Sequence, residues 1–235
     1  LFLLKRSNWS MKNFIHTTLQ GLLNSLDIGF AKDELAYLSS QGKNELQIRD
    51  KIAWRLHNSI NSEFGDDNLY VVRREWAPEG RGREKVDLAI LEMDSTKTVV
   101  VRAIALIEFK AQSIARPEKW YVNEFVNDVA KMRKLKQESI VCKGAALYFA
   151  FIETGQECKA NEYKSILSYA VYQNGKIVYH NEKGYLSAIK THWMTFENAL
   201  GESITIHAPK AIYIGKAFGY KQYISPLLIG PISQK

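Results

Sequence analysis

The chain has 235 residues, with 32 Lys plus Arg against 25 Asp plus Glu and a formal net charge of +7 at pH 7. With 46% hydrophobic and 24% charged residues, the composition is that of a globular protein, and 14 Gly and 5 Pro exclude collagen-like and low-complexity chains. No apolar run approaches the roughly 18 residues of a membrane span, so we expect no membrane partner.

The first half of the chain is predicted to pass from helices to strands. Apolar residues at helical spacing predict two short helices within 11–40 and one longer helix over 43–64. Three segments rich in β-branched and aromatic residues then predict an antiparallel meander of strands, over 69–77, 86–92 and 98–111.

The second half is predicted to be mainly helical, with a buried strand. Pro117 opens a helix to about residue 137, and the apolar run 144–153 predicts a strand buried on both faces. Two further helices are expected over 160–173 and 185–199, then one or two strands within 203–215, while the tail after Phe218 carries no clear pattern.

This order of elements predicts an α/β fold with helices packed on a central sheet. We expect a helical N-terminal extension over 1–42, a core over 43–153 and a C-terminal region over 154–235 that packs on the core. No linker separates them, so one compact domain is expected.

Charged residues interrupt two of the apolar strands. Glu108 and Lys110 lie two residues apart in IALIEFKA, so they project from one face of a strand and Phe109 from the other. Asp87 stands between Val86 and Leu88 near the start of the preceding strand. If the two strands are neighbours, Asp87 and Glu108 meet side by side.

A third acid lies on the predicted helix over 43–64. Glu45 falls on the stripe that continues as Ile48 and Ile52, and Arg49 lies on the same face. A lone buried carboxylate costs several kcal/mol unless it is paired or bound to metal. Either Arg49 satisfies Glu45 locally, or the helix aims Glu45 at the sheet.

Three acids and a lysine on a buried face predict a site for a hard cation. Oxygen ligands without soft ones select Mg²⁺, with Mn²⁺ as a substitute, and the backbone carbonyl of Phe109 could complete the shell. A metal there would lower the pKa of bound water and clamp a phosphodiester, and Lys110 could orient that water. Cys142, Cys158 and the five histidines have no spacing typical of metal ligands.

Asp87 in VDLAI, Glu108-Phe109-Lys110 in IEFKA and an acid on the first helix together resemble the PD-(D/E)xK nuclease superfamily. The resemblance covers residues 43–153 and implies a restriction endonuclease-like αβββαβ core that cleaves DNA or RNA with Mg²⁺. It implies that Asp87 and Glu108 are metal ligands, Lys110 the water-orienting residue and Glu45 an accessory acid.

The E-x-K motif also occurs at Glu157–Lys159 and Glu162–Lys164, which the pattern places at or in a helix as solvated charges. Only Glu108–Lys110 is embedded in an apolar strand. Val86 stands where the superfamily has Pro, a residue without a chemical role. The competing interpretation is a structural ion pair between Lys110 and either Glu108 or Asp87.

Basic residues flank the predicted site. The loop just before Asp87 carries three candidates for phosphate contact: Arg81, Arg83 and Lys85. Two weaker candidates follow Lys110, namely Gln112 and Arg116. A second basic group follows on the predicted helix, where cations also favour a helix C-terminus: Lys131, Arg133, Lys134 and Lys136. Three tryptophans could stack on bases, although burial is the commoner role: Trp76, Trp120 and Trp193.

The sequence therefore predicts a Mg²⁺-dependent endonuclease acting in restriction, phage defence or repair, with DNA favoured over RNA. The alternative is a non-catalytic module that binds nucleic acid or protein on the same scaffold, and a hydrolase for other phosphoesters has less support. Two cysteines without a disulfide framework predict a reducing, cytoplasmic compartment. A homodimer is possible, since cutting both strands needs two active sites.

Overall fold

The computed structural model describes residues 8–41, 44–113, 118–161, 164–174, 176–201 and 210–233. The helical elements are α1 (Asn8–Asn24), η1 (Leu26–Gly29), α2 (Glu34–Ser40), α3 (Glu45–Phe64), α4 (Glu118–Glu138), η2 (Ile140–Cys142) and α5 (Glu182–Leu200). The strands are β1 (Tyr70–Trp76), β2 (Val86–Met93), β3 (Val100–Ser113), β4 (Ala146–Asn161), β5 (Lys164–Gln173), β6 (Lys176–His180), β7 (Ile212–Ala217) and β8 (Tyr220–Ile229).

A mixed sheet forms the centre of the molecule. Strands β1, β2 and β3 are an antiparallel meander, and α4 then carries the chain across to β4, which pairs with β3 in parallel. Strand β8 pairs antiparallel with β4 and brings β7 with it, while β5 and β6 extend the far end of β4. The predicted α/β class, with a mixed sheet between helices, is confirmed.

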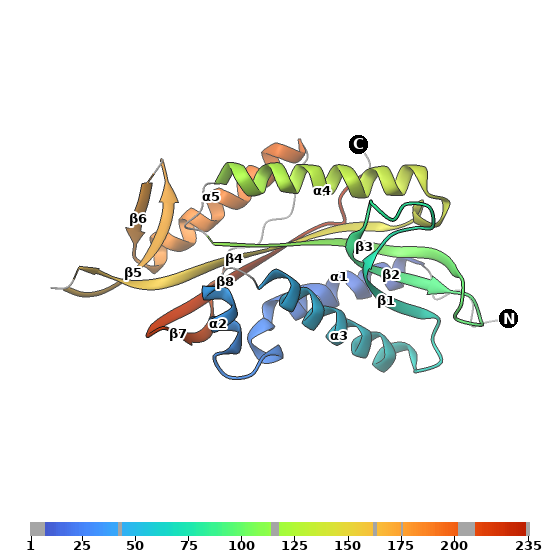
Figure 1. Ribbon diagram of the computed structural model, residues 1–235, viewed down its shortest axis with the longest axis horizontal. Coiled ribbons are helices and arrows are strands. Elements are labelled where there is room, and N and C mark those ends of the chain that lie inside the picture. Colours follow the sequence, from blue (N-terminus) through green and yellow to red (C-terminus); the bar gives the residue numbers. More distant parts are fainter. Residues whose placement is uncertain are drawn as a thin grey trace.

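Helices cover both faces of the sheet (Figure 1). Helices α4 and α5 lie on one face, and α1, α2 and α3 lie on the other. Along β4, Phe149 and Phe151 join the core under α4 and α5, whereas Tyr148, Ala150 and Ile152 join the core under α1 and α3. The strand predicted over 144–153 is thus buried on both faces, and it continues further than predicted.

Helix α3 follows from its apolar repeat. Ile48, Ile52, Leu56 and Ile60 are all fully buried, so the stripe that predicts the helix is also the face that packs on the sheet. The helix ends at Gly65, whose φ of 84° suits a residue without a side chain. This packing brings the first two turns of α3, with Glu45 and Arg49, to the edge of the sheet.

The C-terminal half contains the errors of the sequence prediction. The helix expected over 160–173 is wrong: β4 extends to Asn161, and residues 164–173 form β5, paired with β4 and β6. These pairings satisfy the backbone through contacts that the local sequence does not reveal. The helix expected over 185–199 is confirmed as α5, and the unassigned tail forms β8.

Of the strands expected within 203–215, the described part contains β7, and residues 202–209 lie outside the described residues. Within the part of the chain that the structure describes, every helix is too short or too polar to cross a lipid bilayer.

Candidate active site

Two of the predicted acids meet strand β3 where its neighbour β2 begins. The ladder between the two strands ends at the Leu88–Ile107 pair, so the following stretch of β3 offers backbone N–H groups at an open edge. The N–H of Phe109 donates to Oδ2 of Asp87 at 2.8 Å, and the N–H of Ala111 donates to Oε2 of Glu45 at 3.1 Å. Asp87 and Glu45 therefore cap this edge from β2 and α3.

Glu108 and Lys110 share the face of β3 that looks toward α4. Glu108 is 3% exposed, and Oε1 of its carboxyl group lies 2.7 Å from Nζ of Lys131. The ammonium of Lys110 lies 3.1 Å from Glu124 on α4 and 3.8 Å from Glu45 on α3. Lys110 thus bridges the two helices across the edge of the sheet.

Arg49 pairs with acids other than Glu45. Its guanidinium is buried and lies 2.9 Å from Asp50, 3.1 Å from Glu75 and 3.8 Å from Oδ1 of Asp87. Of the two alternatives for Glu45, the structure shows the second: the helix directs Glu45 at the sheet. Arg49 instead contributes an ion pair to Asp87.

The electrostatics of the site are dominated by burial of Glu108. Burial, reinforced by the nearby Asp87 carboxylate, raises the pKa of Glu108 to about 9, although Lys131 acts in the opposite direction. Burial also raises the pKa of Glu45. For Lys110 and Lys131, burial lowers the pKa, but carboxylates led by Glu45 and Glu108 outweigh it and the net shifts are upward.

These groups fit a hard divalent cation. Two neighbouring acids, one of them buried and reluctant to ionise, are stabilised as carboxylates by a cation of double charge. The direct ligands would be Asp87 and Glu108, with the Phe109 carbonyl leaving β3 on the same side as its N–H. Among the described residues no cluster of three or more His, Cys, Asp or Glu is arranged to hold a metal ion.

Sequence reasoning missed the contribution of α4 to this site. Glu124, Asp128 and Lys131 follow each other at spacings of four and three residues, so they share one face of the helix. Lys131 was a candidate for phosphate contact in the sequence, but in the structure it pairs with both Glu108 and Asp128. The signal was present as a charged stripe beside the apolar positions Phe125 and Val129.

The residues predicted to contact phosphate differ in whether acidic side chains hold them. Arg81 pairs with Glu138 at 2.6 Å and with Glu84 at 3.3 Å, whereas Arg83 and Lys85 are exposed. Gln112 is half-buried, and its carbonyl accepts a hydrogen bond from Thr154 at 3.1 Å. Arg116 lies outside the described residues.

The second basic group is divided among partners. Lys134 pairs with Glu84, and the guanidinium of Arg133 donates to the carbonyl of Ser233 at 3.2 Å. The pKa of Lys136 is lowered by burial and by Lys12.

Of the three tryptophans, the two whose side chains the structure describes are buried or half-buried. Trp193 is 1% exposed and Trp76 is half-buried, while the side chain of Trp120 lies outside the described part. The expectation that Glu157 is a solvated charge on a helix is wrong: it is buried in β4 and pairs with Lys221 at 3.3 Å. Its E-x-K motif lies within β4, because the strand continues beyond its apolar run.

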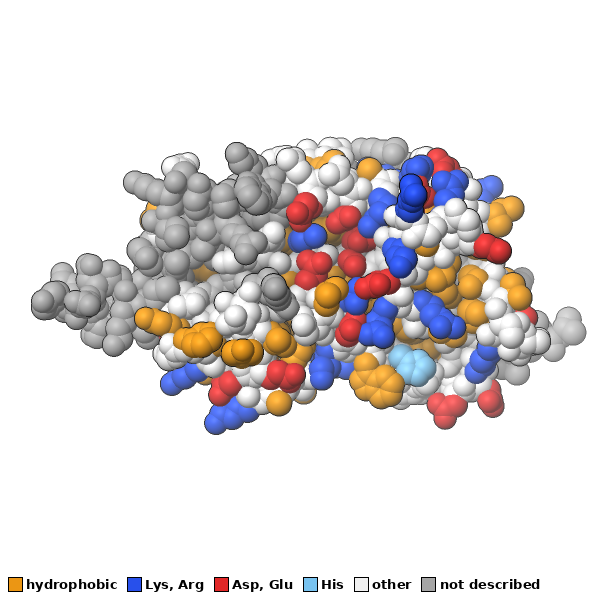
Figure 2. Space-filling model, in the orientation of Figure 1, with side chains coloured by type: hydrophobic (Ala, Val, Ile, Leu, Met, Phe, Trp, Pro, Cys, Tyr) orange, Lys and Arg blue, Asp and Glu red, His pale blue; other side chains and the backbone are white. Residues whose placement is uncertain are grey.

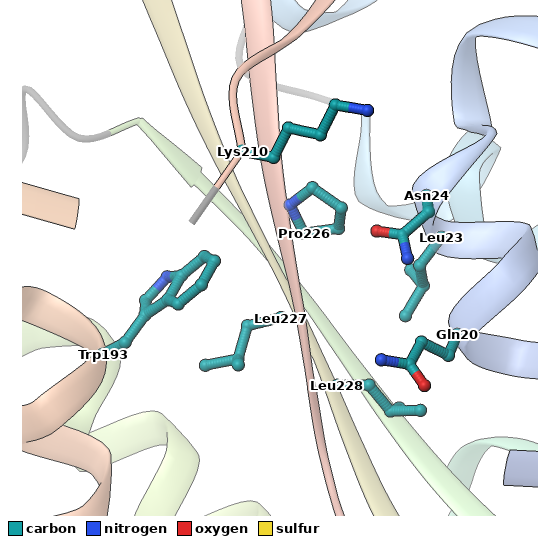
Figure 3. A pocket seen from close by; sticks show the side chains of 8 residues that line it. All are labelled: Gln20, Leu23, Asn24, Trp193, Lys210, Pro226, Leu227 and Leu228. Carbon is teal, nitrogen blue, oxygen red and sulfur yellow. The ribbon is translucent and has the colours of Figure 1, made fainter. Parts of the chain in front are cut away.

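Two hollows lie at different distances from this site. A groove of about 450 Å³, lined by Arg49, Arg73, Arg74 and Glu75 among others, opens beside the site through the shared Arg49. A second pocket of about 300 Å³ lies between α1, α5 and β8, and Lys210, Trp193 and Leu227 are among its walls (Figure 3). It shares no residue with the acids of the candidate site.

Comparison with known proteins returned no match. No protein-family model, no curated protein and no solved structure matches the chain.

Proposed function

We propose that the chain is a Mg²⁺-dependent nuclease of the restriction endonuclease-like type, which hydrolyses phosphodiester bonds and acts on DNA in preference to RNA. The observation that carries the proposal is the position of Asp87 of β2 beside β3, where it accepts a hydrogen bond from the N–H of Phe109, the residue between Glu108 and Lys110. The order helix, three strands, helix, parallel strand between α3 and β4 supports it.

The roles of the chain's own residues follow from their contacts. Asp87 and Glu108 would hold Mg²⁺, which when bound supplies an activated water and a clamp for the phosphate. The ammonium of Lys110, which lies between Glu45 and Glu124, would orient the water or balance charge on the phosphorus. Glu45 and Glu124 fix Lys110 from two sides, and Arg49 fixes Asp87.

The surroundings of the site suit a polyanion. Figure 2 shows acidic side chains gathered near the centre of one face, between α4 and α3, with Lys and Arg beside them over β1 and β2. Arg73 and Arg74 are exposed in the groove beside Arg49, and Arg83 and Lys85 are exposed on the loop before Asp87. Such cations supply affinity that does not depend on base sequence.

The decisive experiment is a cleavage assay with plasmid, single-stranded DNA and RNA in Mg²⁺ and Mn²⁺. D87N, E108Q and K110M are each expected to lower the cleavage rate at least about a hundredfold, because each removes a group that acts at the reacting phosphate. Circular dichroism checks that the fold is retained. E92Q, which alters an acid of β2 paired with Arg102, is the matched control and should cut normally.

Absence of cleavage of every substrate by the unaltered protein, or normal cleavage by K110M, would overturn the proposal. A two-strand cut would further require two sites, and size-exclusion chromatography tests whether a homodimer supplies them.

A specific observation also favours a non-catalytic binding module. Every charged group of the site has a partner: Lys131 for Glu108, Arg49 for Asp87, Glu124 for Lys110. Ion pairs of this kind can hold a sheet edge without any metal. Calorimetric titration with Mn²⁺ separates the two functions, since the module binds none and the nuclease binds at least one ion.

A further inference from the structure

Helix α4 places a cation directly on the carboxyl group that the proposed function assigns to metal. The ammonium of Lys131 lies 2.7 Å from Oε1 of Glu108, and Glu108 is 3% exposed. The contact is an ion pair at close range. A divalent ion at Glu108 would therefore face a positive charge within contact distance.

A second partner for Lys131 is already in place. Oδ1 of Asp128, one helical turn earlier, lies 3.3 Å from the same ammonium. The lysine side chain is flexible and has three donors, so it can leave Glu108 and stay paired with Asp128 while the backbone of α4 stays fixed.

We propose that Lys131 is a resident cation that occupies the ligand position of Glu108 in the metal-free protein and moves to Asp128 when a divalent ion binds. The inference rests on the proposed metal site and adds a device that sets its affinity. Lys131 is a positioning residue in this scheme, because it acts through Glu108 and touches no reacting atom.

Charge arithmetic gives the direction of the effect. The ammonium of Lys131 lies 2.7 Å from Glu108 and repels a divalent ion bound there, so loss of this charge favours the metal. Replacement of Lys131 by a neutral residue should strengthen metal binding.

The test is calorimetric titration of the full chain with Mn²⁺ at one fixed pH, without nucleic acid. K131M is expected to bind Mn²⁺ about tenfold more tightly than the unaltered protein, since a buried repulsive charge is removed. K134M removes the same charge one turn away on α4, from a lysine paired with Glu84, and should leave the affinity unchanged. D128N removes the alternative partner and should weaken Mn²⁺ binding several-fold.

The outcomes separate this inference from the proposed function. Equal affinities for K131M and the unaltered protein would overturn the role of Lys131 while leaving the metal site standing. No Mn²⁺ binding by either protein would overturn both. Unchanged affinity in D128N would overturn the movement to Asp128.

Folding of the variant provides a second readout. K131M leaves Glu108 without its cation, so its melting temperature in chelator should fall, and Mn²⁺ should raise it by more than in the unaltered protein. If K131M does not fold in chelator, recovery of its helical circular dichroism on addition of Mn²⁺ supports the inference, and failure to recover contradicts it. The same titration is repeated with K131Q, because glutamine keeps a hydrogen-bond donor near Glu108 but carries no charge.

Discussion

Glu108 is the residue on which the site depends. It is buried in a strand that is apolar on both sides, and its ionisation is opposed by the charge of Asp87 and favoured by Lys131. A buried acid with a raised pKa, beside a second acid and inside a sheet, is uncommon as a purely structural element. Such a group destabilises the chain whenever it ionises without a cation to balance it.

The pH dependence of stability tests this environment. The pKa of Glu108 is about 9 in the folded chain against an ordinary 4.5, so between these values the folded state holds a proton that the unfolded state has released. The contribution to stability is full below about pH 4.5 and is lost as pH rises to about 9. E108Q should remove this loss and raise the unfolding free energy at pH 8, by on the order of 1–3 kcal/mol.

Urea unfolding in chelator, at several pH values from 5 to 9, measures the effect. E92Q serves as the reference, because Glu92 is a partly exposed acid paired with Arg102. If the difference between E108Q and the unaltered chain stays constant across this range, the environment assigned to Glu108 is wrong.

At the scale of elements, the site is a consequence of how α3 meets the edge of β3. Ile48, Ile52, Leu56 and Ile60 dock the helix on the sheet, and this docking delivers Glu45 to the N–H of Ala111. The acid thus satisfies a backbone donor that the end of the β2–β3 ladder leaves at the edge. The role of Glu45 as a hydrogen-bond acceptor for Ala111 can therefore be tested separately from the role of its negative charge.

Two substitutions at Glu45 distinguish these roles. E45A removes the acceptor and should lower the unfolding free energy by about 1 kcal/mol or more, whereas E45Q keeps an acceptor oxygen and should lie within about 0.5 kcal/mol of the unaltered chain. Urea denaturation measures both, with E63A on the exposed side of α3 as the control. Equal stability of E45A and E45Q would show that the cap contributes nothing.

Sequence patterns were reliable for elements whose packing is local in origin. Helix α3 and strands β1 to β3 follow from periodicity, and so does α5, where Asn181 caps the first turn by accepting from the N–H of Gly184. Strand β5 was missed, because it is specified by pairing with β4 and β6. The charged stripe on α4 was visible in the sequence, but nothing local distinguishes a stripe that faces the sheet from one that faces water.

For the whole molecule, the excess of 32 basic over 25 acidic residues is the property that bears on partners. Around the candidate site, the described cations are of two kinds. Arg81, Lys131 and Lys134 are held by acids, whereas Arg83 and Lys85 are exposed next to the candidate site. Exposed cations of the second kind are those expected to contact phosphate.

Salt dependence of nucleic-acid binding tests this division. The affinity for a labelled DNA duplex, measured by fluorescence anisotropy in chelator, should fall steeply with salt. R83A and K85A should each reduce the slope of log K against log salt by about 0.9, the amount expected for one phosphate contact. R81A should leave the slope unchanged, since Glu84 and Glu138 already hold this side chain. Identical slopes for all three variants would show that the loop before Asp87 does not contact the DNA.

By itself, the sequence determined that Asp87, Glu108 and Lys110 interrupt apolar strand patterns, and it predicted an antiparallel meander, because the alternation of side chains along a strand is encoded locally. Only the tertiary structure decided that Glu45 caps Ala111, that Arg49 serves Asp87, and that Lys131 faces Glu108. These contacts join residues from α3, β2, β3 and α4, and no pattern within a single element specifies which side chains meet when separate elements pack.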